Sequence, residues 1–457
     1  MPIAHRSDEL LLAALCEAPR PFLLPPLPAD EATARSRGAE TALAFALERA
    51  RTDAATAEST RALFTSSLAE LIRRALSPDH GDSVFQAQVL RSQRPDVDEF
   101  VRLSASHARD ERAVRSQVDA VGHPGKLAHA PAGPLREQRS RLHELATSRS
   151  WAALADAAQQ LAAQAPSDAP WRETVAGIVR NAALQRLQRF EALQPLEPVQ
   201  RYMTLLARSG PRAGSDAAAD RGRVAAQLGD AAERETTLAF AAIAALLDGA
   251  APEAGRHRVI TGLRTPQGFP AAGPRTKDEW DVALVRDSSS GAQVVLLAEV
   301  KAAPPAAAAD LPQLLRGLQR LAQADPGSTY AFPSAQGDID LGGATLRALQ
   351  PRDGALPRHV IYCCPAAVES SPAMLGAAAR SVLLAEPGSI AFATRVLEDA
   401  SPSEADLDEV WDAVRTAPRL RPVLEQDATA RAARNAMLRP AALVEEVCRL
   451  CAPRRSG

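Results

Sequence analysis

The stretch Val294-Val295-Leu296-Leu297-Ala298-Glu299-Val300-Lys301 decides the fold prediction. It is an apolar run, typical of a buried strand, that ends in an acid, a spacer and a lysine. Only three of the 53 Lys+Arg residues are lysines, namely Lys126, Lys277 and Lys301. A lysine at the end of this strand, in a chain so rich in arginine, indicates a specific role rather than a generic positive charge.

A second apolar run, Trp280-Asp281-Val282-Ala283-Leu284-Val285, precedes this strand and carries an aspartate. Side chains alternate along a strand, so Glu299 and Lys301 share one face. A short turn centred near Ser289 and Ser290 joins the two runs. It places Asp281 opposite Glu299 or one diagonal step away, with Cβ atoms about 5 Å or about 7–8 Å apart. The two carboxylates are therefore expected to converge.

Two carboxylates at this separation can share one hard cation, and Mg²⁺ usually takes only one or two of them. We therefore expect Asp281 and Glu299 to bind Mg²⁺, or Mn²⁺ in its place. The metal would polarise a scissile phosphate. Lys301 would orient the attacking water or help to deprotonate it. Burying these charges is costly unless they pair or bind a metal. The alternative is a structural Glu299–Lys301 pair that closes the strand.

Asp281 followed after 17 residues by Glu299-Val300-Lys301 resembles the PD-(D/E)xK nuclease superfamily, which has the restriction-endonuclease-like fold. The resemblance covers roughly residues 229 to 365. It implies an αβββαβ core with a mixed sheet. It also implies that Asp281 and Glu299 are metal ligands, that the Val300 carbonyl is a further ligand, and that Lys301 is the catalytic lysine. Trp280 stands where the superfamily's motif has its proline, a position that commonly varies.

Many members carry a glutamate on the first core helix that faces the metal, and Glu233 and Glu235 are the candidates here. We choose Glu235 because it aligns with Leu238 and Ala242 on the predicted buried stripe. The alternative is a solvated acid in the first turn of the helix, where the helix dipole favours it.

Other polar residues near the motif carry weaker predictions. Gln313 and Arg316 are candidates for phosphate contacts, with a solvated helix face as the alternative. Gln313 is followed four residues later by Gly317, so the Gln-x-x-x-Tyr of the RecB-like branch is absent. Glu279 shares the face of Asp281 and is a candidate for an additional acid beside the metal ligands. Residues 101 to 149 carry a charge balance of +4, which indicates either a phosphate-binding surface or a solvated helix surface.

The fold class is α/β, with a restriction-endonuclease-like core and a mixed central sheet. We expect a helical N-terminal region at 1–228, a nuclease-like domain at 229–400 and a helical tail at 401–457, with 209–220 as the best linker. The expected helices are Asp230–Leu247 and Asp310–Ala324, with Asp310 as the N-cap of the second. The expected strands are His257–Leu263, Glu279–Arg286, Ala292–Lys301, Thr329–Phe332 and His359–Cys364.

Composition narrows the class of protein. The formal net charge of −2 argues against a protein that coats nucleic acid non-specifically. No secretory signal is visible, and the longest apolar run, Leu238 to Leu247, is far below the roughly 20 residues that span a bilayer. We expect a cytoplasmic protein. The odd count of five cysteines argues against a disulfide framework. Cys448 and Cys451 form a CxxC that we interpret as ordinary thiols, with a metal or redox site as the alternative.

These features predict a Mg²⁺-dependent endonuclease that hydrolyses phosphodiester bonds, with DNA as its expected partner. One rival is a nuclease fold without activity that acts as a nucleic-acid-binding or scaffolding module. A third hypothesis is a structural or interaction protein, in which residues 1–228 form the surface that binds a second copy or another protein.

Overall fold

The chain forms two compact units, and the sheet lies in the first of them. The first unit combines Met1–Leu71, Gly214–Glu386 and Ser403–Gly457, and the second combines Ile72–Ala213 and Pro387–Pro402. The limits of these units differ from the boundaries expected at 228 and 400. Residues near the N-terminus pack on the sheet, and residues near the C-terminus add a strand to it. The computed structural model describes residues 6–53, 58–210, 215–271, 276–288, 291–398 and 400–452.

Among the described residues, a five-stranded mixed sheet has the order β1-β2-β3-β6-β7. β1, β2 and β3 are antiparallel neighbours, whereas β6 runs parallel to β3 and β7 parallel to β6. The predicted α/β class with a mixed sheet is therefore confirmed. The strands are β1 (His257–Arg264), β2 (Glu279–Arg286), β3 (Gln293–Val300), β6 (Val360–Cys363) and β7 (Met437–Leu438).

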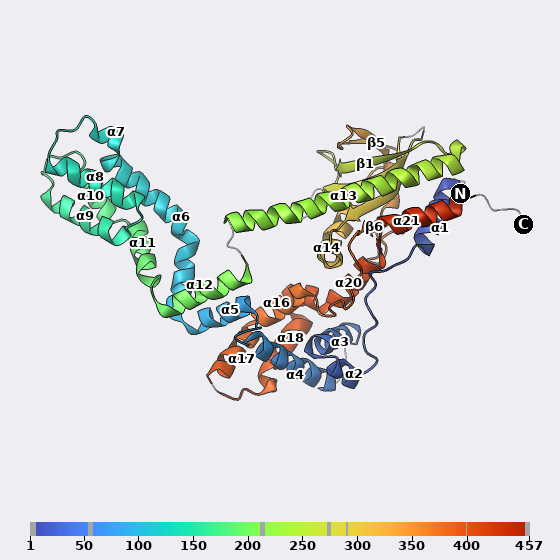
Figure 1. Ribbon diagram of the computed structural model, residues 1–457, viewed down its shortest axis with the longest axis horizontal. Coiled ribbons are helices and arrows are strands. Elements are labelled where there is room, and N and C mark those ends of the chain that lie inside the picture. The colour runs from blue at the N-terminus through green and yellow to red at the C-terminus, as the bar shows by residue number, and fades with distance from the viewer. Residues whose placement is uncertain are drawn as a thin grey trace, which may run out of the picture. The chain divides into compact units, whose positions relative to one another are not determined.

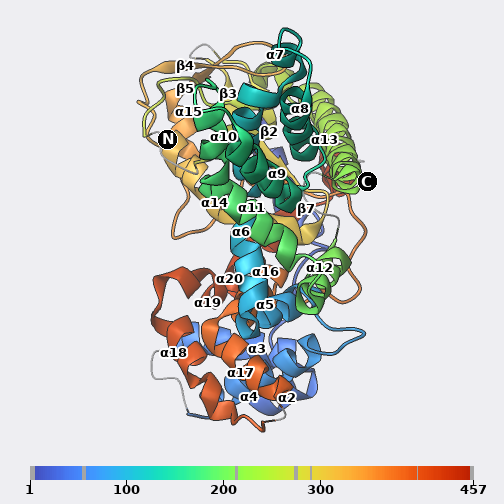
Figure 2. The same ribbon diagram turned by 90° about the vertical axis from the view of Figure 1, so that its left-hand side faces the viewer.

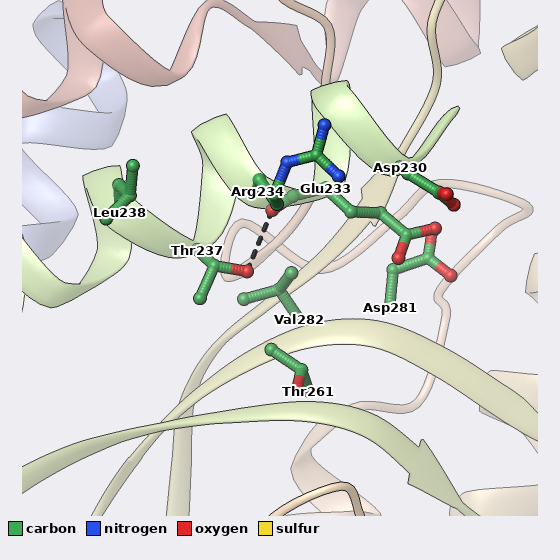
Figure 3. A pocket seen from close by; sticks show the side chains of 8 residues that line it. All are labelled: Asp230, Glu233, Arg234, Thr237, Leu238, Thr261, Asp281 and Val282. Atoms are coloured by element: carbon green, nitrogen blue, oxygen red, sulfur yellow. Dashed lines mark hydrogen bonds between the residues drawn. The ribbon is translucent and has the colours of Figure 1, made fainter. Parts of the chain in front are cut away.

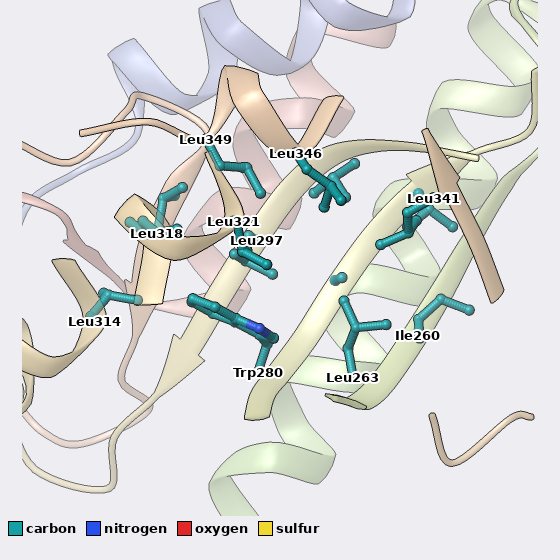
Figure 4. Close-up of a cluster of buried hydrophobic side chains, with 14 of the residues drawn as sticks. Ile260, Leu263, Trp280, Leu297, Leu314, Leu318, Leu321, Leu341, Leu346 and Leu349 are labelled. Atoms are coloured by element: carbon teal, nitrogen blue, oxygen red, sulfur yellow. The ribbon is translucent and has the colours of Figure 1, made fainter. Parts of the chain in front are cut away.

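Helices cover both faces of this sheet, which explains why β2 and β3 are apolar along most of their length. One face packs against α13 and the terminal helices α1 and α21. The other packs against α14, α15 and α20, with Trp280 of β2 beneath the leucines of α14 (Figures 1 and 4). The covering helices are α1 (Arg6–Glu17), α13 (Asp216–Ala250), α14 (Pro304–Leu321), α15 (Gly343–Ala348), α20 (Gln426–Asn435) and α21 (Pro440–Cys451).

The prediction that a helix starts with Asp310 as its N-cap is wrong. α14 begins at Pro304, with Ala303 as its N-cap, and Asp310 lies inside it. Proline is tolerated in the first turn of a helix, where its missing N–H would have no partner in any case. Residues 304–309, which were expected to precede the helix, are therefore its start, and Pro312 lies in its interior.

α13 begins earlier than expected, at Asp216 rather than Asp230, and extends over 35 residues. Ser215 caps it, because its side chain accepts a hydrogen bond from the Ala218 N–H at 3.2 Å. The expected linker at 209–220 is thus partly helical. Its residues 211–214, and residues 289–290 of the expected turn between β2 and β3, lie outside the described residues.

The rest of the first unit surrounds this core. A small two-stranded sheet of β4 (Thr329–Phe332) and β5 (Ile339–Gly342) packs on the α14 side, and neither β5 nor β7 was predicted. The remaining helices are α2 (Glu31–Ser36), α3 (Ala39–Thr52), most of α4 (Glu58–Ala75), α16 (Ala377–Ala385), α18 (Asp408–Thr416) and α19 (Arg421–Leu424), with 3-10 turns at Pro252–Ala254, Glu404–Leu407 and Pro418–Leu420.

The second unit is helical, as predicted for its residues 72–213, and it also contains a helix at 387–397 that was not predicted. Figure 2 shows α8 to α11 gathered against α6, and an apolar cluster of residues 114 to 187 holds them together. Its helices are α5 (Ser83–Gln93), α6 (Pro95–Gly122), α7 (Pro124–Leu127), α8 (Pro134–Thr147), α9 (Trp151–Gln164), α10 (Arg172–Val179), α11 (Ala182–Leu193), α12 (Glu197–Ser209) and α17 (Pro387–Leu397).

Two further expectations concern the whole chain. Among the described residues, none of the helices has the length and apolar character needed to cross a membrane. All five cysteines are free: Cys363 and Cys364 are buried, whereas Cys448 is exposed on α21.

Candidate active site

Glu299 is the most deeply buried acid of the predicted motif, with a fully inaccessible side chain near the end of β3. Its Oε2 lies 2.9 Å from Lys277 Nζ and 3.3 Å from Lys301 Nζ. Its Oε1 is buried and, among the described residues, has no hydrogen-bond partner. A buried carboxylate oxygen without a donor is costly, so Oε1 is the atom at which a ligand would stabilise the site.

The protonation of Glu299 depends on opposing effects. Burial and then the neighbouring Asp281 carboxylate raise its pKa from 4.5 to about 8. Lys277 and Lys301 act in the opposite direction, because their ammonium groups favour the ionised form. The carboxyl group is therefore poised to lose its proton when further positive charge arrives.

Asp281 lies near the start of β2 and is tied to the end of β3. Its Oδ2 accepts a hydrogen bond from the Val300 N–H at 2.7 Å. Val282 pairs with Ala298 across the two strands, so the register continues toward Asp281 and Glu299. The structure therefore brings the two acids to the same end of the strand pair, as their spacing in the sequence predicts.

Asp281 also opens onto a pocket of about 470 Å³ between α13 and the first two strands. Figure 3 shows Glu233 reaching from α13 toward Asp281. Burial and then the Asp281 carboxylate raise the pKa of Glu233 above its usual value. Glu299 does not line this pocket, so Asp281 is the link between it and the buried carboxylate. The lining residues are Asp230, Glu233, Arg234, Thr237, Leu238, Thr261, Asp281 and Val282.

The expectation that Glu235 lies on the buried stripe of the helix is wrong. Glu235 is exposed, and Leu238, which was used to align it, is 72% exposed. The buried line of α13 runs instead through Ala232, Thr236 and Phe240. Alanine occurs on every side of this helix and a threonine lies in the buried line, so apolar periodicity points to the wrong face. Glu233 is the helix acid that meets the site.

Lys301 has a second acidic partner that the sequence did not suggest. Its Nζ lies 3.3 Å from Asp310 Oδ1, and Asp310 Oδ2 accepts a hydrogen bond of 3.0 Å from the Tyr362 hydroxyl. Burial lowers the pKa of Lys301, but the carboxylates of Glu299 and Asp310 outweigh it and raise the pKa above its usual value. Lys301 is therefore an ammonium group in this arrangement.

Lys277 was also missed, although a signal for it was present. It is another of the three lysines, and the argument from rarity applies to it as much as to Lys301. It lies just before β2, packs against the Trp280 ring at 6.0 Å from the centroid, and approaches Glu299 more closely than Lys301 does.

The remaining candidates do not line the pocket. Gln313 and Arg316 are exposed on α14, and neither lines the pocket. Glu279 is half exposed and pairs with Arg264 at 3.2 Å. In the second unit, several arginines of residues 101–149 pair with acids, among them Arg115 with Glu111 at 2.7 Å. That surface agrees better with solvated, paired helices than with a continuous basic patch.

The site as a whole is acidic. Six carboxylates and two ammonium groups influence one another there, which gives a net charge of −4 when all are ionised: Asp230, Glu233, Glu279, Asp281, Glu299 and Asp310 with Lys277 and Lys301. Among the described residues, no group of three or more His, Cys, Asp or Glu side chains is arranged to hold a metal. Mg²⁺ commonly uses only one or two carboxylates, with water and phosphate completing its shell. The pair of Asp281 and Glu299, with the unsatisfied Oε1, fits that donor set.

Comparison of the chain with protein-family models, with curated proteins and with solved structures gave no match.

Proposed function

We propose that the first unit is a metal-dependent nuclease of the restriction-endonuclease-like fold that hydrolyses phosphodiester bonds in DNA. The observation that carries this proposal is the convergence of Asp281, Glu299 and Lys301 where β2 and β3 meet. The order α13, β1, β2, β3, α14, β6, with β4, β5 and α15 inserted between α14 and β6, and the mixed sheet support the fold assignment.

Asp281 and Glu299 would hold Mg²⁺ or Mn²⁺, with the Val300 carbonyl as a further ligand. A bound cation would polarise the scissile phosphate and stabilise the leaving oxygen. The unpartnered Glu299 Oε1 and the net negative charge of the site support this assignment. Because carboxylate ligands bind in their ionised form, the raised pKa of Glu299 makes binding stronger at alkaline pH.

Lys301 acts as a fixed cation in this proposal. Since its pKa is raised, it donates hydrogen bonds to the attacking water or to a phosphate oxygen and does not remove a proton. Glu233 is better suited to accept a hydrogen bond or proton from the water, because it lines the pocket beside Asp281 with a raised pKa.

The pocket offers a contact for the nucleic-acid backbone. Arg234 is the one cationic side chain among the described residues that line it, and Thr237 and Thr261 add hydroxyl groups. Arginine forms directed hydrogen bonds with phosphate oxygens. A nucleic-acid strand that enters this pocket would bring a phosphate toward Asp281. No large basic surface is needed for this contact, in keeping with the chain's net charge of −2.

One observation favours the rival, a nucleic-acid-binding module without activity. Glu299 Oε2 already has two lysine partners, so the motif has a structural function whether or not a metal binds. Activity, rather than geometry, separates the two readings.

The test is cleavage of supercoiled, linear and single-stranded DNA, and of RNA, in Mg²⁺ and in Mn²⁺. Asp281→Asn and Lys301→Met are expected to abolish cleavage while the protein stays folded. Glu235→Gln is the matched control and should cut like the parent, because Glu235 is two positions from Glu233 but does not line the pocket. If the parent cuts none of the four substrates, the nuclease proposal is rejected in favour of the binding module.

A further inference from the structure

The parallel pairing of β3 with β6 brings a tyrosine beside the buried glutamate. Glu299 pairs with Tyr362 and Val300 pairs with Cys363. Directly paired residues of neighbouring strands point to the same face of a sheet. The Lys301 N–H donates to the Cys363 carbonyl at 2.9 Å, so the backbone of the lysine is anchored to the same strand.

Tyr362 extends from β6 toward α14, where it meets Asp310. The tyrosine side chain is fully buried, and its hydroxyl donates to Asp310 Oδ2 at 3.0 Å. The other oxygen, Asp310 Oδ1, lies 3.3 Å from Lys301 Nζ. The hydroxyl, the carboxylate and the ammonium group thus form one connected line from β6 through α14 to β3.

These contacts hold the flexible lysine side chain in one position. A lysine ammonium is a point charge on a flexible stem, and holding it in one place costs side-chain entropy. Glu299 Oε2 holds Lys301 from one side, and Asp310 Oδ1 holds it from another. The Tyr362 hydroxyl in turn fixes the orientation of the Asp310 carboxylate. Burial raises the pKa of Tyr362, so the hydroxyl keeps the proton that it donates.

We propose that Asp310 and Tyr362 are positioning residues that fix Lys301 Nζ for the reaction at Asp281 and Glu299. The inference rests on the proposed nuclease function for its kinetic consequence, but the placement of Lys301 can be measured without any activity. Neither residue touches substrate. Both act through the ammonium group, whose displacement by even 1 Å can cost about a hundredfold in rate.

The competing reading is that Tyr362 only fills the core beside α14. Tyr362→Phe separates the two, because it keeps the ring and removes the hydroxyl. Tyr330→Phe is the matched control. The Tyr330 hydroxyl also makes a hydrogen bond in the first unit, accepting from the Asp325 N–H at 2.8 Å, but it has no contact with Lys301.

The scarcity of lysine makes a direct structural readout practical. Lysine labelled with ¹³C at Cε gives side-chain signals from only three residues, and Lys126→Arg and Lys301→Arg assign them. In the full-length metal-free protein, Tyr362→Phe and Asp310→Asn are expected to shift or broaden the Lys301 signal. The Lys126 signal should stay unchanged, and so should the Lys301 signal in Tyr330→Phe. A Lys301 signal in Tyr362→Phe that superimposes on the parent's overturns the proposal.

The kinetic arm uses the same variants in Mg²⁺. Tyr362→Phe should lower kcat between about tenfold and a hundredfold with little change in KM, whereas Tyr330→Phe should leave both unchanged. Lys301 signals that move while kcat stays at the parent value also overturn the proposal. If the parent cuts no substrate, the proposed function fails and the kinetic part of this inference fails with it. The spectra then still decide whether Asp310 and Tyr362 hold Lys301.

Discussion

Lys277 Nζ lies 2.9 Å from Glu299 Oε2, closer than Lys301 Nζ at 3.3 Å. The two lysines therefore differ in their surroundings. Lys277 has Glu299 as its acidic partner and the Trp280 ring beside it, whereas Lys301 is shared between Glu299 and Asp310. In the proposed nuclease, we expect Lys277 mainly to neutralise the buried carboxylate and Lys301 to act on the substrate.

Lys277→Met tests that division. Loss of the closer ammonium group should destabilise the metal-free protein by about 1–3 kcal/mol, because Glu299 loses a charged hydrogen-bond partner. It should also raise the pKa of Glu299 further above 8. Urea unfolding measures the first effect. Lys126→Met, which removes an exposed lysine in the second unit, is the control and should change the free energy of unfolding little. Equal stability of the two variants would contradict this role for Lys277.

Glu299→Gln should change how stability depends on pH. The folded-state pKa of Glu299 is about 8 and its usual value is 4.5, so between these values the folded protein binds more protons than the unfolded chain. The contribution of this group is therefore fully present below pH 4.5 and is lost as the pH rises through 8. Each pKa unit corresponds to about 1.4 kcal/mol. Glutamine has no such titration.

The measurement is the melting temperature of the metal-free parent and of Glu299→Gln between pH 5 and pH 9. We expect the variant to gain stability relative to the parent as the pH rises, by a few kcal/mol at most, in the window given by the two pKa values. Parallel curves for the two proteins would show that Glu299 does not carry the raised pKa.

Glu233→Gln should weaken binding of Mg²⁺ or Mn²⁺ by about tenfold, because Glu233 lies beside Asp281 in the pocket. Glu235→Gln should bind the metal like the parent, since that side chain does not line the pocket. Isothermal titration of both variants with Mn²⁺ at pH 8.5 measures the difference. If both variants lose affinity equally, general electrostatics rather than the position of Glu233 is responsible.

Gly317→Ala should disturb the site from α14. A Cβ at this position would lie 2.8 Å from Lys277 Cβ and 2.8 Å from the Trp280 ring, so one of them must move. We expect a loss of about 1–3 kcal/mol of stability from overpacking. Gly229→Ala, in α13, meets none of the described atoms within 4 Å and should instead stabilise the protein by about 0.5–1 kcal/mol. Thermal unfolding of the two variants checks the opposite signs.

Much of the sheet could be predicted because its strands are continuous apolar runs. β2 was predicted with its observed ends, Glu279 and Arg286, and β3 within about one residue at each end. Alternation along β3 also places Glu299 and Lys301 together, as observed. These are local properties of a strand, which a sequence displays directly.

The partners of the motif could not be predicted, because each depends on the fold around it. Asp310 contacts Lys301 from inside α14, which starts at Pro304. Because of the prolines in this stretch, the start of the helix was predicted at Asp310 instead. The position of Tyr362 follows from a parallel register between strands about sixty residues apart. Glu233 was passed over because alanine on all sides of α13 hides which face is buried.

The nuclease proposal is best tested by measuring both binding and cleavage of one labelled DNA in the same samples, at pH 8.5 with Mg²⁺ and with Mn²⁺. This pH lies above the pKa of about 8 for Glu299, so its carboxylate is available to the metal. We predict that the parent binds and cuts the DNA, whereas Lys301→Met binds it and does not cut. A parent protein that binds the DNA and leaves it intact with both metals would contradict the nuclease proposal and identify a binding module.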